Sequence, residues 1–204
     1  MGRKKATAPR KRPRQERSRA LVEAILDAAA RLLVRDGYEG TTTNRIAEVA
    51  GVSVGSLYQY SPNMDSIVRA LLERHVQEAL SLRPSRLDDS RLSLRDRFRL
   101  SVEWHLAVHA ADPKLHRVLT TLAPSVLGTQ MLGDFEMSVQ ATIRAVLERH
   151  ADEIRPENVE VASFLVATVL EASTHAAVLR RPELLDEPDL ASELTDLIGR
   201  YLEA

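Results

Sequence analysis

Residues 37–60 read GYEGTTTNRIAEVAGVSVGSLYQY, and this stretch contains signals for two short helices around one glycine. Thr42 and Ser53 are expected N-caps, because a Thr or Ser hydroxyl accepts a hydrogen bond from a backbone N–H in the first turn of a helix. Gly51 is expected to end the first helix, since glycine adopts the left-handed conformation without strain. Two short helices joined by a tight turn predict a helix-turn-helix.

The apolar residues of the same stretch predict how its two helices pack. Ile46, Ala50, Val52 and Leu57 are expected to form the seam between them, and the small Ala47 would let the second helix cross close to the first. The sequence thus supplies both the turn and the packing that a helix-turn-helix needs.

The rest of the chain also has the pattern of helices. From about residue 17 to Gly37, apolar residues recur with the helical period. After Pro62, Asn63 is expected to cap a long helix that reaches residue 80. Further helices are predicted over residues 93–111, 113–122, 127–150, 157–179 and 189–202, and no strand pattern is found. The predicted fold class is all-α, with an N-terminal three-helix helix-turn-helix domain followed by a C-terminal helical bundle.

Two of these helices are expected to form a homodimer interface. Residues 157–179 are apolar on all sides, and such a helix must be buried on all sides. Residues 189–202 carry one wide apolar stripe. Together the two helices would supply half of a four-helix interface. The alternative is an ordinary central helix covered by the last one.

The charge of the chain is unevenly distributed, although its net value is only −1. Residues 1–14 contain seven cations and no acidic residue, which predicts a flexible basic arm over residues 1–16. Residues 15–75 carry seven basic and eight acidic residues. The basic excess of the N-terminal region therefore comes from the arm, which is expected to attract nucleic acid without reading its sequence.

Composition excludes several classes of protein. The chain has no cysteine, which excludes disulfide scaffolds, thiolate zinc sites and cysteine nucleophiles and favours a reducing compartment. No apolar core follows the basic N-terminus, so no secretory signal is expected. The uncharged stretch over residues 161–170 is about half the length of a membrane span. The sequence predicts a cytoplasmic protein without a membrane partner.

The stretch over residues 37–60 closely resembles the DNA-binding signature of the tetracycline-repressor (TetR) family. The glycine after the first helix, the Thr pair, Ile-Ala at 46–47, Ala-Gly-Val-Ser at 50–53 and Leu-Tyr-x-Tyr at 57–60 occur in the family's order and spacing. Beyond the helix after Pro62, the chain resembles the family in architecture alone. The resemblance implies a dimeric, ligand-responsive transcriptional regulator, most often a repressor that a small-molecule effector releases from a palindromic operator.

The resemblance also implies roles for individual residues in binding double-stranded DNA. The expected phosphate contacts are Thr42, Thr43, Ser53 and Tyr60. The residues expected to face the groove or its edge are Arg45, Val54, Gly55, Ser56, Tyr58 and Gln59. The residue chemistry agrees, because glutamine can pair with adenine and serine can bond to several base edges. Residues 54–60 contain no Lys or Arg, so bidentate reading of guanine from this helix is not expected.

Two residues depart from the family pattern. The family usually has a large apolar residue where this chain has Ser61, and a Lys or Arg where it has Met64. Ser61 is expected to reduce packing against the long helix, and Met64 to remove one ionic contact with a phosphate. The basic arm would compensate, since each cation that neutralises a phosphate adds about 0.9 to the salt dependence of binding.

The family's effector pocket lies among the middle helices, so the resemblance implies an effector site there. The candidate lining residues are the bulky or polarisable side chains Trp104, His105, Met131, Phe135 and His175. The alternative for each is ordinary core packing. Their mixture predicts a moderately hydrophobic small molecule.

Histidine spacing raises the question of a metal. His105 and His109 are four residues apart, as are Glu171 and His175, and this spacing can chelate a metal on one helix face. Nothing in the sequence brings three or four ligands together, so no metal site and no cofactor is predicted. A buried, hydrogen-bonded imidazole is the expected state of His105. Sequence spacing yields no catalytic constellation, and no enzyme activity is expected.

The sequence therefore predicts three parts. Residues 1–16 form the basic arm, residues 17–62 the helix-turn-helix domain, and residues 63–204 a regulatory domain for effector binding and dimerisation. The predicted function is a sequence-specific transcriptional regulator acting on a pseudo-palindromic operator. The alternative is a protein that coats nucleic acid through its basic arm and binds without sequence preference.

Overall fold

The structure is a computed structural model that describes residues 16–203. Within this range it describes the backbone but not the side chains of Arg17, Asp88, Pro188 and residues 129–136. The predicted basic arm lies outside the described residues, apart from Glu16 at the start of the first helix. Residues 16–203 form helices joined by loops and contain no strand, which confirms the predicted all-α class.

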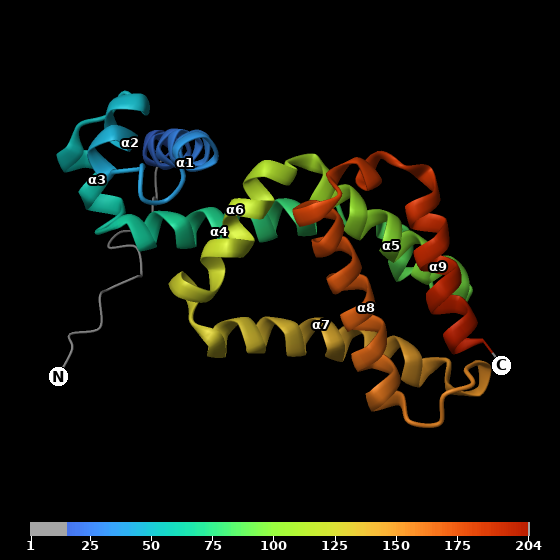
Figure 1. The fold of residues 1–204 in the computed structure, drawn as a ribbon. Helices are drawn as coiled ribbons and strands as arrows, with labels where there is room; N and C mark the ends of the chain where they lie inside the picture. Colours follow the sequence, from blue (N-terminus) through green and yellow to red (C-terminus); the bar gives the residue numbers. More distant parts are fainter. Residues whose placement is uncertain (1–15, 204) are drawn as a thin grey trace. The chain divides into compact units, whose positions relative to one another are not determined.

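Nine α-helices lie in the described part of the chain (Figure 1). They are α1 (Glu16–Asp36), α2 (Thr43–Val49), α3 (Val54–Tyr60), α4 (Met64–Ser81), α5 (Leu94–Ala111), α6 (Pro113–Leu127), α7 (Thr129–Arg149), α8 (Val159–Arg180) and α9 (Pro188–Leu202). Short 3-10 helices occur at η1 (Ser85–Asp88), η2 (Ala151–Glu153) and η3 (Pro182–Asp186).

Helix α6 is longer than the sequence predicted. The predicted end at residue 122 is wrong, because the helix continues through Pro124 and ends before Gly128, whose φ is 81°. Proline lacks an N–H donor and disfavours a helix interior. Leu119, Ala123 and Val126 are nevertheless buried, so the packing of one apolar face outweighs this local preference.

The described chain divides into two compact units. The first extends to Glu78 and also contains Lys114–Gly128, and the second contains Ala79–Pro113 and the chain from Thr129 onward. The sequence placed the domain boundary between residues 62 and 63. In the structure, most of α4 and nearly all of α6 belong with the helix-turn-helix.

The core of the first unit is built by α1, α2, α3, α4 and α6. Its fully buried large aliphatic side chains are Ile25, Leu32, Leu33, Ile46, Leu57, Ile67, Val68, Leu71 and Leu119. The predicted seam is present, with Ile46 and Leu57 at its centre and Ala50 and Val52 half-buried against it. Burying one such large side chain contributes about 1.5–3 kcal/mol, so Leu57 largely determines how α3 sits on the core.

Local hydrogen bonds define the helix-turn-helix. The backbone N–H of Arg45 donates to the hydroxyl of Thr42 at 3.3 Å, and that of Ser56 donates to Ser53 at 3.0 Å. Both predicted N-caps are therefore confirmed. Gly51 has a φ of 68°, the left-handed conformation expected where α2 gives way to the turn.

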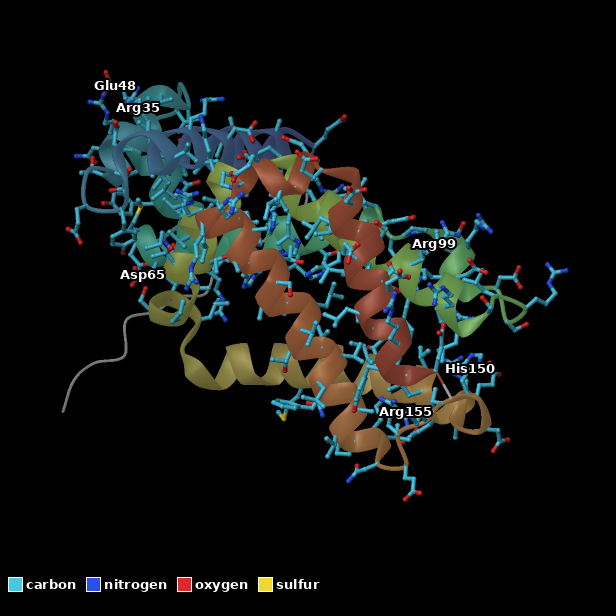
Figure 2. The ribbon with its side chains drawn as sticks, turned by 45° about the vertical axis from the view of Figure 1, so that its right-hand side comes forward. Arg35, Glu48, Asp65, Arg99, His150 and Arg155 are labelled. Atoms are coloured by element: carbon cyan, nitrogen blue, oxygen red, sulfur yellow. The ribbon has the colours of Figure 1, made fainter. Side chains whose placement is uncertain are left out.

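Polar contacts connect the start of α4 to the helix-turn-helix. The backbone N–H of Ser66 donates to Asn63 Oδ1 at 2.9 Å, which confirms Asn63 as the cap. The hydroxyl of Tyr38 donates to Asp65 Oδ1 at 2.5 Å (Asp65 is labelled in Figure 2). Burial and the adjacent carboxylate raise the pKa of Tyr38 to about 12, so the phenol stays protonated.

Further along α4, two more contacts join it to other helices of the first unit. The guanidinium of Arg74 contacts carboxylates of α1, at 2.7 Å from Asp27 and 3.1 Å from Glu23. His75 Nε2 lies 3.0 Å from Nδ1 of His116 on α6. Helix α4 is thus connected to both α1 and α6.

The second unit is a bundle of α5, α7, α8 and α9. In Figure 1, α9 lies alongside α5 and α8 crosses α7, in agreement with the contacts between these pairs. The most deeply buried core side chains are Val102, Leu147, Ala162, Val166, Ile198 and Leu202.

Helix α8 is buried on one side of the single chain and exposed on the other. The buried side includes Ala162, Val166, Thr174 and Val178. Between the exposed charges of Glu160 and Arg180 at its two ends, the exposed side is uncharged and consists of Val161, Phe164, Leu165, Thr168, Ala172, Ala176 and Leu179. By length and composition alone, α8 is the one helix of the described chain that could cross a membrane, and 33% of its apolar window is buried. A buried core helix passes the same test.

Candidate DNA-binding surface and effector site

The predicted DNA-contacting residues lie on the outer side of the helix-turn-helix. Seven are exposed, namely Thr42, Arg45, Ser53, Val54, Gly55, Tyr58 and Gln59. The other three, Thr43, Ser56 and Tyr60, are half-buried. On α3, Leu57 points into the core while the residues on either side of it remain outside.

Hydrogen bonds order the polar side chains of this surface. Thr43 Oγ1 lies 3.0 Å from the hydroxyl of Tyr58, which connects α2 to α3. The hydroxyls of Ser53 and Ser56 lie 2.8 Å apart. Side chains already held in one rotamer lose less conformational entropy when they meet a ligand.

Arg45 is the only Lys or Arg between residues 42 and 60. Its guanidinium lies 3.8 Å from Asp36, whose carboxylate makes two closer contacts of 2.7 Å with Arg35. The hydrogen bonds from Arg35 lower the pKa of Asp36, although burial opposes this. A long, exposed ion pair stabilises little, so Arg45 can exchange Asp36 for a phosphate or a base edge at small cost.

The two residues that depart from the family pattern face the core. Ser61 is buried, and its N–H donates to the carbonyl of Leu57 at 2.9 Å. Met64 is half-buried and packs against the core of the first unit. The effect of either residue on DNA affinity stays a prediction.

Of the predicted effector residues, Trp104, His105 and His175 have described side chains and are half-buried in the second unit. Met131 and Phe135 belong to α7, in the segment whose side chains lie outside the described residues. The indole Nε1–H of Trp104 donates to the backbone carbonyl of Ala79 at 3.0 Å.

His105 and His175 are brought together by a residue that the predicted site omitted. One oxygen of Glu171 lies 3.4 Å from Nε2 of His105, and the other lies 3.2 Å from Nε2 of His175. His105 Nε2 is buried and forms no aligned hydrogen bond. Burial, with smaller effects of His109 and His175, lowers the pKa of His105 to about 3. Its imidazole is therefore neutral at neutral pH, but its Nε2 lacks the hydrogen bond that the sequence led us to expect.

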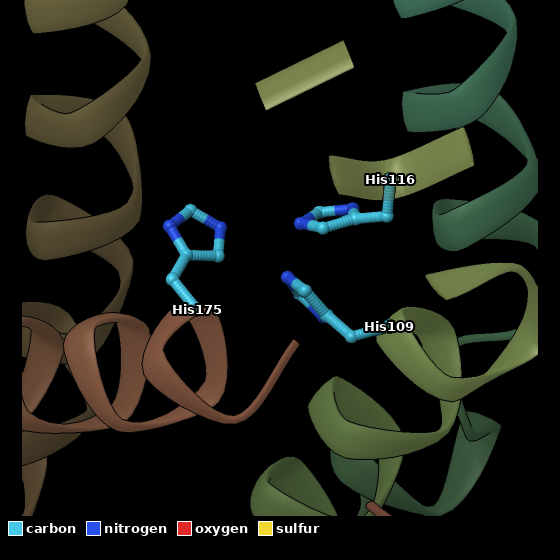
Figure 3. A group of neighbouring side chains, drawn as sticks. All are labelled: His109, His116 and His175. Carbon is cyan, nitrogen blue, oxygen red and sulfur yellow. The ribbon is translucent and has the colours of Figure 1, made fainter. Parts of the chain in front are cut away.

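His109 completes this group. Its ring centroid lies 4.3 Å from that of His105 and 5.5 Å from that of His175. Figure 3 shows the rings of His109 and His175 turned toward one another across the gap between α5 and α8. The sequence signal was the pair of four-residue spacings, 105–109 on one helix and 171–175 on another, but spacing alone does not show that the two helices pack together.

An exposed polar surface on a helix-turn-helix, carried by a chain with a separate helical unit, defines a DNA-binding regulator with a regulatory body. The family models agree. Residues 25–71 match the model described as bacterial regulatory proteins, tetR family, and residues 93–202 match the tetracyclin repressor-like, C-terminal domain. The chain belongs to the TetR family. Members of this family are DNA-binding transcriptional regulators, generally without enzymatic activity.

Similar curated proteins include further regulators. The chain is 49% identical over 51 residues to the uncharacterized HTH-type transcriptional regulator YvkB of Bacillus subtilis, and 32% identical over 99 residues to the nucleoid occlusion factor SlmA of Vibrio campbellii. These matches cover 25% and 48% of this chain, and 27% and 50% of the relatives. The chain is also 25% identical over 186 residues to the uncharacterized regulator MT2310 of Mycobacterium tuberculosis, covering 87% and 92% of the two chains.

Solved structures share the fold. A bacterial regulatory protein of the tetR family from Rhodococcus RHA1 superimposes with a TM-score of 0.73 at 20% identity, covering 90% of this chain and 97% of that one. NalD of Pseudomonas aeruginosa, the secondary repressor of the MexAB-OprM multidrug efflux pump, gives 0.69 at 22% identity, covering 92% and 98%. These likenesses show the fold alone, an N-terminal helix-turn-helix domain in a chain that continues into a helical body.

Proposed function

We propose that the protein is a repressor that binds a pseudo-palindromic operator as a homodimer and leaves it when a small-molecule effector binds. The observation that carries this proposal is α3, where Leu57 fixes one side in the core while Tyr58 and Gln59 remain exposed on the other. A recognition helix needs this arrangement, because its outer side chains must reach base edges in the major groove.

Individual residues have distinct roles in this proposal. Thr42, Thr43, Ser53 and Tyr60 contact phosphates and set the orientation of the domain on the duplex. The residues that face the groove or its edge are Arg45, Val54, Gly55, Ser56, Tyr58 and Gln59. The two helix-turn-helix domains of a dimer, one from each chain, would contact half-sites whose centres are about 34–36 Å apart or a multiple of that distance.

The exposed side of α8 supports dimerisation. Its uncharged stripe includes Phe164, which is 53% exposed in the single chain, and α9 adds Leu197, which is 55% exposed. Contiguous apolar surface of this kind is typical of a protein interface. Pairing α8 and α9 with the same helices of a second chain would cover both side chains.

Effector binding is proposed for the second unit, around Trp104, His105 and His175. The other two predicted lining residues, Met131 and Phe135, remain part of the proposal. Helix α4 is the proposed transmitter, because its last turn accepts the hydrogen bond from Trp104 while its earlier turns contact α1 and α6. By linkage, an effector that prefers the DNA-incompetent state weakens DNA binding by its preference ratio.

Gel shifts at one fixed, moderate salt concentration test the DNA-binding part. The probes are a palindrome from the promoter nearest the gene and a scrambled duplex of equal length and composition. The proposal expects a clear preference for the palindrome that survives removal of residues 1–14. Equal affinity for both duplexes, lost together with the arm, would instead support the nucleic-acid-coating function.

A further inference from the structure

Four metal-ligating side chains of the second unit come together although they originate from two different helices. Helix α5 supplies His105 and His109, and helix α8 supplies Glu171 and His175. Each pair has a four-residue spacing, so both of its side chains project from one face of their helix. From this cluster we infer that the second unit binds one divalent transition-metal ion through three imidazoles and one carboxylate.

The donor distances suit a metal. Zinc ligands lie about 2.0–2.2 Å from the ion, so two ligands at a tetrahedral angle are about 3.3–3.5 Å apart. The Glu171 oxygens lie 3.4 Å from His105 Nε2 and 3.2 Å from His175 Nε2. The ligating nitrogens of His109 and His175 lie within 4.8 Å of each other. A single ion would draw the Nε2 atoms of His105 and His109 into the same coordination sphere by rotation of their side chains.

The hydrogen bonding of His109 is of the kind found around bound metals. Its Nδ1 lies 2.7 Å from the backbone carbonyl of His105, and a carbonyl can only accept, so Nδ1 carries the proton. The lone pair is therefore on Nε2. Metal-ligating histidines commonly donate their other ring N–H to a carbonyl in this way, which fixes the tautomer and the orientation of the ring.

The surroundings allow a cation to enter and to be held. The side chain of Glu171 is 46% exposed, whereas those of His105 and His175 are 19% and 28% exposed. Three imidazoles with one carboxylate favour zinc, copper or nickel. Calcium and magnesium take oxygen ligands and are not expected here.

A bound metal ion would connect α5 to α8. Because it would join two helices of the second unit, this ion is assigned as an effector of the regulator. This regulatory step rests on the proposed function, whereas metal binding itself does not. At the polar side of the effector site, next to Trp104, the expected effector is therefore a metal ion.

The test uses the full chain, free of any histidine tag, and Zn²⁺ alone as the probe in competition with a colorimetric chelator. One equivalent per chain is expected. Glu171→Gln and His175→Asn should each weaken binding by about tenfold or more, since altering even the residues that hydrogen-bond to metal ligands costs about 10–100-fold in metal affinity. Glu153→Gln is the matched control, because Glu153 pairs with His150 at 3.0 Å outside the cluster and should leave binding unchanged.

Circular dichroism and urea midpoints establish that each variant is folded. A Co²⁺ spectrum adds a direct readout, since intense visible bands require tetrahedral coordination of the ion, and these bands should weaken or shift in His109→Asn. Absence of stoichiometric Zn²⁺ binding by the folded wild-type chain would overturn the inference. Binding that is equally tight in Glu171→Gln and His175→Asn would also overturn it.

Operator gel shifts with and without Zn²⁺ separate this inference from the proposed function. A Zn²⁺-dependent change in operator affinity that is lost in Glu171→Gln supports the regulatory step, and an unchanged affinity on a metal-loaded chain rejects it. Selective operator binding by a chain that holds no metal would refute the metal site alone. Stoichiometric metal binding without any operator preference would instead refute the proposed function.

Discussion

The indole of Trp104 donates its N–H to the carbonyl of Ala79, at 3.0 Å, and thereby attaches α5 to the last turn of α4. Ala79 follows Glu78, the residue at which the first of the two segments of the first unit ends. Helix α4 continues from the turn that Trp104 contacts back to Ile67 and Leu71, both in the core of the first unit.

Trp104→Phe keeps an aromatic ring but removes this hydrogen bond. The free energy of unfolding should fall by about 1 kcal/mol, the usual contribution of one neutral hydrogen bond. Urea denaturation measures this change. Gel shifts should show that the effector-free variant still binds the operator. Unchanged stability would mean that the bond between Trp104 and Ala79 contributes nothing.

Ser53 is both a helix cap and a proposed phosphate contact, and two substitutions separate these roles. Ser53→Ala removes the acceptor for the Ser56 N–H, so it should lower the free energy of unfolding by about 1 kcal/mol and weaken DNA binding. Ser53→Asp can still cap the helix but places a negative charge next to phosphates. It should keep its stability and lose about tenfold or more in operator affinity, or about 1.4 kcal/mol. Operator binding by Ser53→Asp at the wild-type level would exclude the phosphate contact.

The bond between Tyr38 and Asp65 predicts a stability change at alkaline pH. The folded-state pKa of Tyr38 is raised to about 12, from about 10 in an unfolded chain. The folded state then retains a proton that the unfolded state has lost, so the stabilisation is complete below pH of about 10 and disappears as pH rises toward about 12. Tyr38→Phe should lower stability by about 1 kcal/mol at pH 8 and flatten this alkaline decline. Urea midpoints between pH 8 and 11 measure both effects, and an equally steep decline in the variant would assign it to other groups.

Gln59 is the side chain of α3 best suited to read adenine. Gln59→Ala should cost about 1–3 kcal/mol on the operator and relax the preference at one base-pair position in each half-site. Gel shifts with single base-pair changes in the operator locate that position. Affinity for scrambled DNA should stay the same. A uniform loss on both duplexes would show that Gln59 contacts the backbone instead.

Phe164 tests the proposed dimer. Phe164→Glu places a charge within the exposed stripe of α8, and a charge buried at an interface without a partner is strongly unfavourable. Analytical ultracentrifugation should detect monomers where the wild-type chain is dimeric. Met137→Glu is the matched control, since Met137 on α7 is 61% exposed and lies outside α8 and α9. Dimers that persist in Phe164→Glu would place the interface elsewhere.

Local signals made the first half of the fold predictable. Thr42, Gly51 and Ser53 act through contacts within a few residues, and the structure contains the expected caps and turn. The end of α6 was not predictable in the same way. Pro124 is a local helix breaker, and only the burial of Leu119 and Val126 in a core built by distant segments explains why the helix continues.

The same distinction applies to the candidate sites. The exposure of Tyr58 and Gln59 follows from the helical period of α3. With Leu57 in the core, its neighbours in the sequence lie on other faces of the helix, and this period can be read from the sequence. The meeting of Glu171 with His105 depends on the packing of α5 against α8, and the sequence contains only the two spacings. Tertiary contacts between residues 66 positions apart are not encoded in any local pattern.

The chain passes between its two units three times, after Glu78, after Pro113 and after Gly128. Neither unit is therefore one continuous piece of the gene. A hybrid regulator that joined residues 1–62 to the regulatory domain of another protein would lack Ile67, Leu71 and Leu119. It would therefore lack part of the core against which α3 packs. Modular exchange of DNA specificity for this protein requires either transfer of the outer side chains of α3 alone or transplantation of two separate segments, the second of them α6.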